Sequence, residues 1–295
     1  MRVNGFNFCA SLGGIGLSLD SGILVVEFTR PDRMNAMTPD LKRDLMEVLA
    51  QAQMADEVRV VVFCGQKHFS SGDDISGQGP TSSAIKPVLV PQIEHGHRNP
   101  VSTWSGLRVH SQSLNTAIRG LGKLTIAAME GYAIQTGFSL ALCCDFRIAS
   151  RTARMGSATL RFGLLPDEGG HYLLVRALGL SRALDFVLRK RIVSAEAALN
   201  LGLVHEVVEP AQLRGAALSL ARELAAGPQV AMRFVKQSLY NAAELDWHHA
   251  LDDIASKTAV TDHHADAVEG VAAFVEKRSP EFNRWLRQPA SKSKL

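Results

Sequence analysis

The sequence is poor in the residues and patterns that mark several classes of protein. It has only four cysteines, Cys9, Cys64, Cys143 and Cys144, and no C-x-x-C pair. Three of them lie in apolar runs, so we interpret them as reduced packing residues of a cytoplasmic protein. No apolar stretch is long enough to span a bilayer. The N-terminal segment is broken by glycines and lacks a clean cleavage site, so we expect a first strand there rather than a signal peptide.

Strong charge of either sign is also absent. The chain has 32 Lys and Arg against 29 Asp and Glu, a net charge of +3, without a dense basic block. This balance argues against a nucleic-acid partner. We interpret Lys292 and Lys294 in the basic tail as part of a solvated chain end. Internal repeats and low-complexity tracts are lacking, and the 295 residues, 46% of them hydrophobic, allow a substantial core.

The first half of the chain carries a strand–helix–strand pattern. Residues 23–28 (ILVVEF) and 58–64 (VRVVVFC) are apolar runs typical of buried strands. Between them, Thr38 is suited to cap a helix and Pro39 to begin it. Apolar residues follow at helical spacing from Leu41 onward. Such a unit builds a parallel sheet.

The rest of the chain predicts an α/β core followed by helices. We expect a strand over 123–134 with a turn near Gly131, a buried helix over 136–145, a strand over 146–150, two short helices in 169–190 broken at Gly179, and a last strand over 203–209. Everything after Pro210 has a helical period. The predicted division is an α/β core over 1–209 and a helical region over 210–295.

Residues 76–105 differ from their surroundings. Their content of Pro, Gly and Ser predicts a long irregular loop, of a length that is usually functional or disordered. The loop contains Glu94, His95 and His97, a cluster that could bind a metal ion. A third ligand at a suitable spacing is not evident, so we expect a solvated loop and no metal.

Two junctions between an apolar strand and a glycine stand out, HFSSGDDISG (68–77) and EGYAIQTGFSLAL (130–142). Where a helix begins, backbone N–H groups point outward without an internal acceptor. One such junction is weak evidence for a site. Two of them could supply two N–H donors to one oxygen, the arrangement that stabilises an oxyanion made from a thioester carbonyl.

The sequence resembles the enoyl-CoA hydratase/isomerase (crotonase) family. The segments that carry the resemblance occur in the family's order: RPDRMNAMTPDL (30–41), VRVVVFCGQKHFSSGDDISG (58–77), IAAMEGYAIQTGFSLALCCDFRIAS (126–150), FGLLPDEGG (162–170), LNLGLVHEVV (199–208) and VEGVAAFVEKRSPEF (268–282). The resemblance implies the α/β crotonase (ClpP/crotonase-like) fold, a spiral of ββα units. It also implies C-terminal helices that build homotrimers, often paired into hexamers.

The resemblance further implies that the chain acts on acyl-CoA thioesters through an enolate-like intermediate, with no cofactor beyond the CoA of the substrate. By family position, the backbone amides of Asp73 and Thr136 form the oxyanion hole. Residues from Met34 to Ala36 fall where the chain lies along CoA, and Ser71 where a backbone group contacts its adenine. Lys277 falls near a place where a neighbouring subunit approaches the cofactor.

The departures from the family pattern bear on the reaction. Ser139 and Thr159 stand where the hydratases carry their two glutamates. Hydroxyl groups hold water but cannot act unaided as a general base near neutral pH. Gln135 and Thr136 replace family glycines, which restricts the backbone conformations open to the oxyanion hole.

Asp167 falls where dienoyl-CoA isomerases and ring isomerases of the family keep a catalytic aspartate, and where a dehalogenase keeps its nucleophile. Its simpler interpretation is an N-terminal cap of a surface helix. Glu168 is interpreted as a helix cap, and His171 as a partly exposed helix residue that could orient a substrate. A carboxylate beside an acyl chain loses solvation, which raises its pKa toward that of a working base.

Three functions stay open. The first is isomerisation of a double bond, with Asp167 moving the proton. The second is hydration, with Asp167 or Glu168 acting on water. The third is binding of acyl-CoA by a chain that has lost its chemistry. Self-assembly is expected from apolar positions in the C-terminal helices, namely Leu251, Ile254, Ala255, Val271, Phe274 and Val275.

Overall fold

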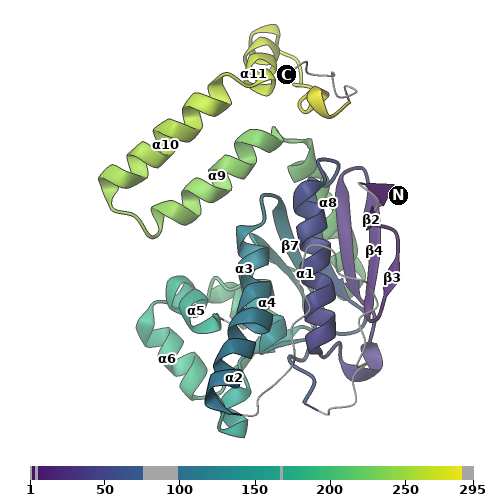
Figure 1. The fold of residues 1–295 in the computed structure, drawn as a ribbon, viewed down its shortest axis with the longest axis vertical. Coiled ribbons are helices and arrows are strands. Elements are labelled where there is room, and N and C mark those ends of the chain that lie inside the picture. The colour runs from purple at the N-terminus through teal and green to yellow at the C-terminus, as the bar shows by residue number, and fades with distance from the viewer. Residues whose placement is uncertain (1, 4–5, 76–98, 167–168, 288–295) are drawn as a thin grey trace.

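The computed structural model describes residues 2–3, 6–75, 99–166 and 169–287. Its centre is a seven-stranded sheet in the order β12-β9-β7-β6-β5-β4-β3 (Figure 1). The strands are β3 (Ser11–Leu12), β4 (Ile15–Asp20), β5 (Ile23–Phe28), β6 (Val60–Gly65), β7 (Leu124–Met129), β9 (Phe146–Ser150) and β12 (Glu206–Val208). From β5 to β12 all pairs are parallel, whereas β3, β4 and β5 pair antiparallel.

The sheet separates two hydrophobic cores, because side chains along a strand alternate between its faces. On β6, Val61 and Phe63 pack toward α1 (Pro39–Met54), α3 (Ser113–Gly120) and α4 (Thr136–Cys143). Val60 and Val62 pack on the other face against α8 (Leu213–Ala226). The helices on both faces are visible in Figure 1. Burial on both faces explains why these strands read as unbroken apolar runs.

Several local predictions are confirmed. Thr38 caps α1, its side chain accepting a hydrogen bond from the Leu41 amide at 3.2 Å, and β5 spans the predicted residues. The predicted strand over 123–134 divides near Gly131 into β7 and β8 (Tyr132–Ile134). The helices α5 (Gly170–Leu178) and α6 (Leu180–Leu188) meet at Gly179, whose φ of 73° favours glycine.

Other predictions need correction. The N-terminal segment forms β1 (Arg2–Val3), β2 (Phe6–Asn7), β3 and β4 rather than one strand. The last strand, β12, covers only three of the seven residues predicted. The prediction of a loop over 76–105 is wrong at the C-terminal end of this range. There α2 (Pro100–Gly106) begins, with a reciprocal cap between Asn99 and Ser102. Residues 76–98, with Glu94, His95 and His97, lie outside the described residues.

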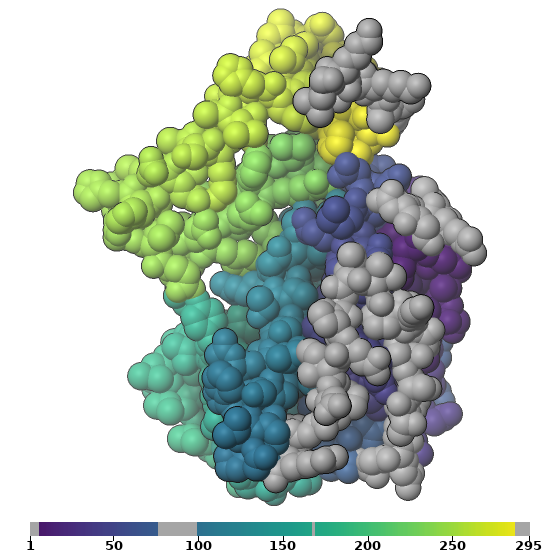
Figure 2. Space-filling view, in the orientation of Figure 1, coloured from purple at the N-terminus to yellow at the C-terminus, as the bar shows by residue number. Residues whose placement is uncertain are grey.

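A second, three-stranded sheet was not predicted. It joins β8 to β10 (Arg154–Gly156) and β11 (Ile192–Ser194), and α7 (Ala195–Asn200) follows it. Beyond α8, the helices α9 (Gln229–Ala242), α10 (Trp247–Asp262) and α11 (Ala265–Glu276) project from the body (Figures 1 and 2). The assembly role of residues 210–295 stays a prediction. Within the described residues, no helix is long and apolar enough to cross a membrane.

Lys123, buried just before β7, makes the stability of the fold depend on pH. Its Nζ donates to the Ala55 carbonyl at 2.9 Å. Burial, and secondarily the charge of Arg233, lowers the pKa of Lys123 from 10.5 to about 8. Between pH 8 and pH 10.5, Lys123 is protonated in the unfolded chain and neutral in the folded chain. Stability therefore rises with pH across this window, by at most about 3 kcal/mol at about 1.4 kcal/mol per unit.

The Lys123→Met variant lacks this titration. We expect its free energy of unfolding to change less between pH 7.5 and 10 than that of the parent chain. Urea unfolding of both proteins at several pH values in this range measures the difference. Parallel pH profiles would contradict the assignment to Lys123.

Candidate active site

The two glycine junctions meet between β6, β8 and the segment before α1. Ser70 forms a parallel bridge with Ala133, in which its amide donates to Tyr132 and its carbonyl accepts from Ile134, both at 2.8 Å. Asp73 forms a second parallel bridge with Met37. The residues flanking Asp73 make the two hydrogen bonds of that bridge, at 2.8 and 3.0 Å. The amide of Asp73 itself is therefore directed away from Met37.

Glycines permit this close approach. A Cβ on Gly137 would lie 2.6 Å from the Ser70 carbonyl oxygen, and one on Gly72, whose φ is +102°, would lie 3.0 Å from Gln135 Cβ. Gln135 itself has φ 51° and ψ −116°, a conformation unusual for a residue with a side chain. Gln135 thus takes a backbone conformation that favours glycine. Thr136, the next residue, is the first residue of α4.

The side chains of Asp73 and Thr136 are in direct contact. Thr136 Oγ1 donates to Asp73 Oδ1 at 2.7 Å. The same carboxylate oxygen lies 2.7 Å from Nζ of Lys42, a buried residue of α1, and this Nζ also donates to Ser111 Oγ at 2.9 Å. The two residues predicted to form the oxyanion hole are therefore held together by a polar network. Sequence reasoning missed Lys42, because charged residues of a helix usually face water, whereas those of α1 are buried.

The structure brings together some, but not all, of the residues predicted to contact CoA. The amide of Ser71 donates to the Met34 carbonyl at 2.9 Å, so these two stretches lie side by side. Ala36 is buried, and its carbonyl accepts from Arg30 at 3.1 Å. Lys277 ends α11, in the projecting C-terminal helices (Figure 1). Among the described residues it makes no hydrogen bond or ion pair with the junctions.

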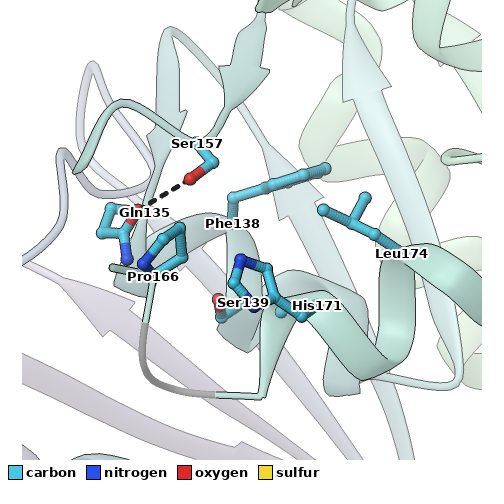
Figure 3. A pocket seen from close by; sticks show the side chains of 8 residues that line it. Gln135, Phe138, Ser139, Ser157, Pro166, His171 and Leu174 are labelled. Carbon is cyan, nitrogen blue, oxygen red and sulfur yellow. Dashed lines mark hydrogen bonds between the residues drawn. The ribbon is translucent and has the colours of Figure 1, made fainter. Parts of the chain in front are cut away.

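A small cavity adjoins the start of α4 (Figure 3). Its volume of about 10 Å³ has room for about one water molecule. Ser139 lines it, whereas Thr159, at the other hydratase position, does not. The polar lining also includes Ser157, which donates to Gln135 Oε1 at 3.1 Å, and His171, whose buried Nε2 has no hydrogen-bond partner among the described residues.

A larger, apolar cavity of about 280 Å³ lies next to the small one, between α5 and α6. His171, Leu174 and Pro166 line both cavities. Asp167 and Glu168 lie outside the described residues, but Pro166 and Gly170, on either side of them in the sequence, line the small cavity. Within the part of the chain that is described, no three metal-ligating side chains gather.

Comparisons with known proteins agree with this fold. The sequence profile of the enoyl-CoA hydratase/isomerase family matches residues 18–89 and 90–285. The chain is 31% identical to the 1,2-epoxyphenylacetyl-CoA isomerase of Escherichia coli K12, covering 90% of this chain and 96% of that protein. It is 28% identical to the (E)-benzylidenesuccinyl-CoA hydratase of Thauera aromatica, covering 91% and 98%.

Solved structures match as well. An enoyl-CoA hydratase from Bacillus anthracis superposes with a TM-score of 0.81 at 26% identity, covering 91% of this chain and 98% of that one. The chain therefore belongs to the enoyl-CoA hydratase/isomerase family. It has the crotonase fold and is an acyl-CoA enzyme of that family, as the sequence predicted.

Proposed function

We propose that the enzyme moves a carbon–carbon double bond within an acyl-CoA thioester. In this proposal the thioester oxygen is held by the amides of Asp73 and Thr136. The observation that carries it is the meeting of the two junctions, with Asp73 and Thr136 joined side chain to side chain at 2.7 Å. Preorganised N–H donors of this kind stabilise negative charge that develops on a carbonyl oxygen.

The proposed steps need one carboxylate. The Asp167 carboxylate removes a proton from C-2 of a 3-enoyl thioester, and the electron pair of the C–H bond moves into the thioester to form an enolate. The same residue, now a carboxylic acid, returns the proton to C-4, and the double bond becomes 2,3. No water is consumed. Ser139 at the first hydratase position supports this choice, because a hydroxyl alone is a poor base near neutral pH.

In the same proposal, CoA lies along the stretch from Met34 to Ala36 and over Ser71. Because the Ser71 amide is already bonded to Met34, contact with the adenine falls to the Ser71 carbonyl. Lys277 approaches CoA only across subunits. No cofactor is needed beyond CoA itself.

Hydration is the second candidate function, and the small cavity favours it. Ser139 and the buried Nε2 of His171 line a space for about one water molecule beside α4. In that case Asp167 or Glu168 would activate the water. An acyl-CoA-binding chain without activity is the remaining alternative.

One experiment separates the three functions. The enzyme is incubated in ¹⁸O-enriched water with 3-enoyl, 3,5-dienoyl and 2-enoyl thioesters of CoA, and the products are analysed by mass spectrometry. We expect isomerised products of unchanged mass. Incorporation of ¹⁸O at C-3 would favour hydration. Binding of the thioesters without turnover of any of them would favour the third function, an acyl-CoA-binding chain without activity.

We also propose that the C-terminal helices assemble the chain into a homotrimer or hexamer. Phe274 of α11 is 84% exposed, with Val271 and Val275 beside it, and such an apolar face favours association. We expect light scattering to give a mass three or six times 31.9 kDa. Phe274→Glu should lower this mass, whereas Met54→Glu, at an equally apolar exposed site outside these helices, should not. A monomeric parent protein would contradict the proposal.

A further inference from the structure

Lys42 is one of the five charged residues of α1, all of them buried, and its side chain contacts the first glycine junction. It is only 3% exposed, and its Nζ contacts both Asp73 Oδ1 at 2.7 Å and Ser111 Oγ at 2.9 Å. Burying an ammonium group is unfavourable unless it is paired and hydrogen-bonded. The network supplies both kinds of partner. It also joins elements that are distant in sequence: α1, the segment after β6, the helical turn at Ser111, and the start of α4 through Thr136.

Asp73 has two opposed effects on the proposed chemistry. Its backbone amide would stabilise the enolate oxygen, but its own side chain carries a carboxylate. Oδ1 of this carboxylate contacts Thr136, the residue with the second amide. A negative charge next to a developing oxyanion opposes its formation. The Asp73 side chain is 41% exposed, so solvent screens part of this repulsion. A cation on the same carboxylate oxygen cancels most of this repulsion.

We propose that Lys42 is a positioning and charge-compensating residue of the oxyanion hole. Its ammonium group neutralises Asp73, and with the Thr136 hydroxyl it fixes the carboxylate so that the amides of residues 73 and 136 keep their separation. The inference rests on the proposed function, since it presumes that these amides hold a thioester oxygen.

Asp74, the next residue, has a different environment. Arg30 lies 3.3 Å from it, and the same guanidinium group bonds the Ala36 carbonyl. That pair anchors the segment before α1. The Asp73 carboxylate, by contrast, contacts the side chain of Thr136 directly.

The test compares Lys42→Met with the double variant Lys42→Met/Asp73→Ala. We expect Lys42→Met to lower kcat roughly 10- to 100-fold with little change in KM, below the loss for a deleted oxyanion-hole donor. Adding Asp73→Ala should restore most of kcat, because it removes the uncompensated carboxylate and leaves the backbone amide. A double variant as poor as the single one or poorer would show that the uncompensated Asp73 charge does not cause the loss. That result, or an unchanged kcat in Lys42→Met, would overturn the inference.

Lys236→Met is the matched control. Lys236 is also a buried lysine paired with an aspartate, Asp145, at 3.0 Å, but it contacts neither junction. We expect it to lose stability in urea unfolding while its kcat stays within about twofold of the parent. Lys42→Arg should keep more activity than Lys42→Met, since it keeps the charge.

A second readout does not depend on turnover. Acetoacetyl-CoA has an acidic C–H group, and its enolate absorbs in the ultraviolet. We expect the parent protein to raise the enolate fraction of bound acetoacetyl-CoA at fixed pH and Lys42→Met to raise it less. Equal enolate fractions would overturn the role of Lys42 and leave the proposed function intact. If the parent protein binds acetoacetyl-CoA without raising its enolate fraction, both the proposed oxyanion hole and the proposed role of Lys42 are contradicted.

Discussion

The Asp167→Asn variant is expected to lose isomerase activity, with kcat falling by about 10²- to 10⁴-fold and KM changing little. Asparagine has nearly the shape of aspartate but no basic carboxylate, so the variant can bind a thioester and cannot take its proton. The conjugated 2-enoyl thioester absorbs in the ultraviolet, and its rate of appearance from a 3-enoyl-CoA measures the loss.

Glu168→Gln is the matched control for Asp167→Asn. It makes the same chemical change at the adjacent residue, and we expect it to keep kcat within about threefold, since the proposal gives the proton transfer to one acid. The opposite pattern, with activity lost in Glu168→Gln and kept in Asp167→Asn, would assign the base to Glu168. Full activity in both variants would contradict single-acid isomerisation by either residue.

The parts of the fold that sequence predicts well are those with a strong period over many residues. The strands β5 and β6 are buried on both faces, so they appear as uninterrupted apolar runs, and α1 combines a cap at Thr38 with a long amphipathic pattern. The strands β10 and β11 have three residues each, too few to establish a period. Their pairing with β8 depends on contacts between distant segments.

In the candidate site, too, local features can be predicted from the sequence and contacts between distant segments cannot. The glycine junctions can be recognised in the sequence because Gly72 and Gly137 mark places where another part of the chain comes close. The ion pair of Lys42 with Asp73 joins positions 31 residues apart and could not be read from either segment alone. A charged residue on a helix usually faces water, so the sequence carries no signal that Lys42 is buried.

Gly137→Ala is expected to be strongly damaging where the two junctions meet. The new Cβ would lie 2.6 Å from the Ser70 carbonyl oxygen and 2.7 Å from Ser70 Cβ. Ser70 cannot easily move away, because it is fully buried and its backbone is bonded to Tyr132 and Ile134. The clash therefore pushes α4 away from the segment that carries Asp73. Since the two amides must both face one oxygen, we expect kcat/KM to fall by about 10²- to 10³-fold.

The same substitution should also reduce stability, by about 1–3 kcal/mol, as overpacking of a filled interior usually does. Gly215→Ala is the matched control. Gly215 lies inside α8, where an added Cβ meets no atom within 4 Å. Alanine there should stabilise the helix by about 0.5–1 kcal/mol and leave kcat/KM unchanged. Urea unfolding and steady-state kinetics on both variants test the pair. Gly137 also lies inside a helix, so alanine could stabilise the helix there as at Gly215. A gain in stability in Gly137→Ala with full activity would contradict the requirement for close contact between α4 and Ser70.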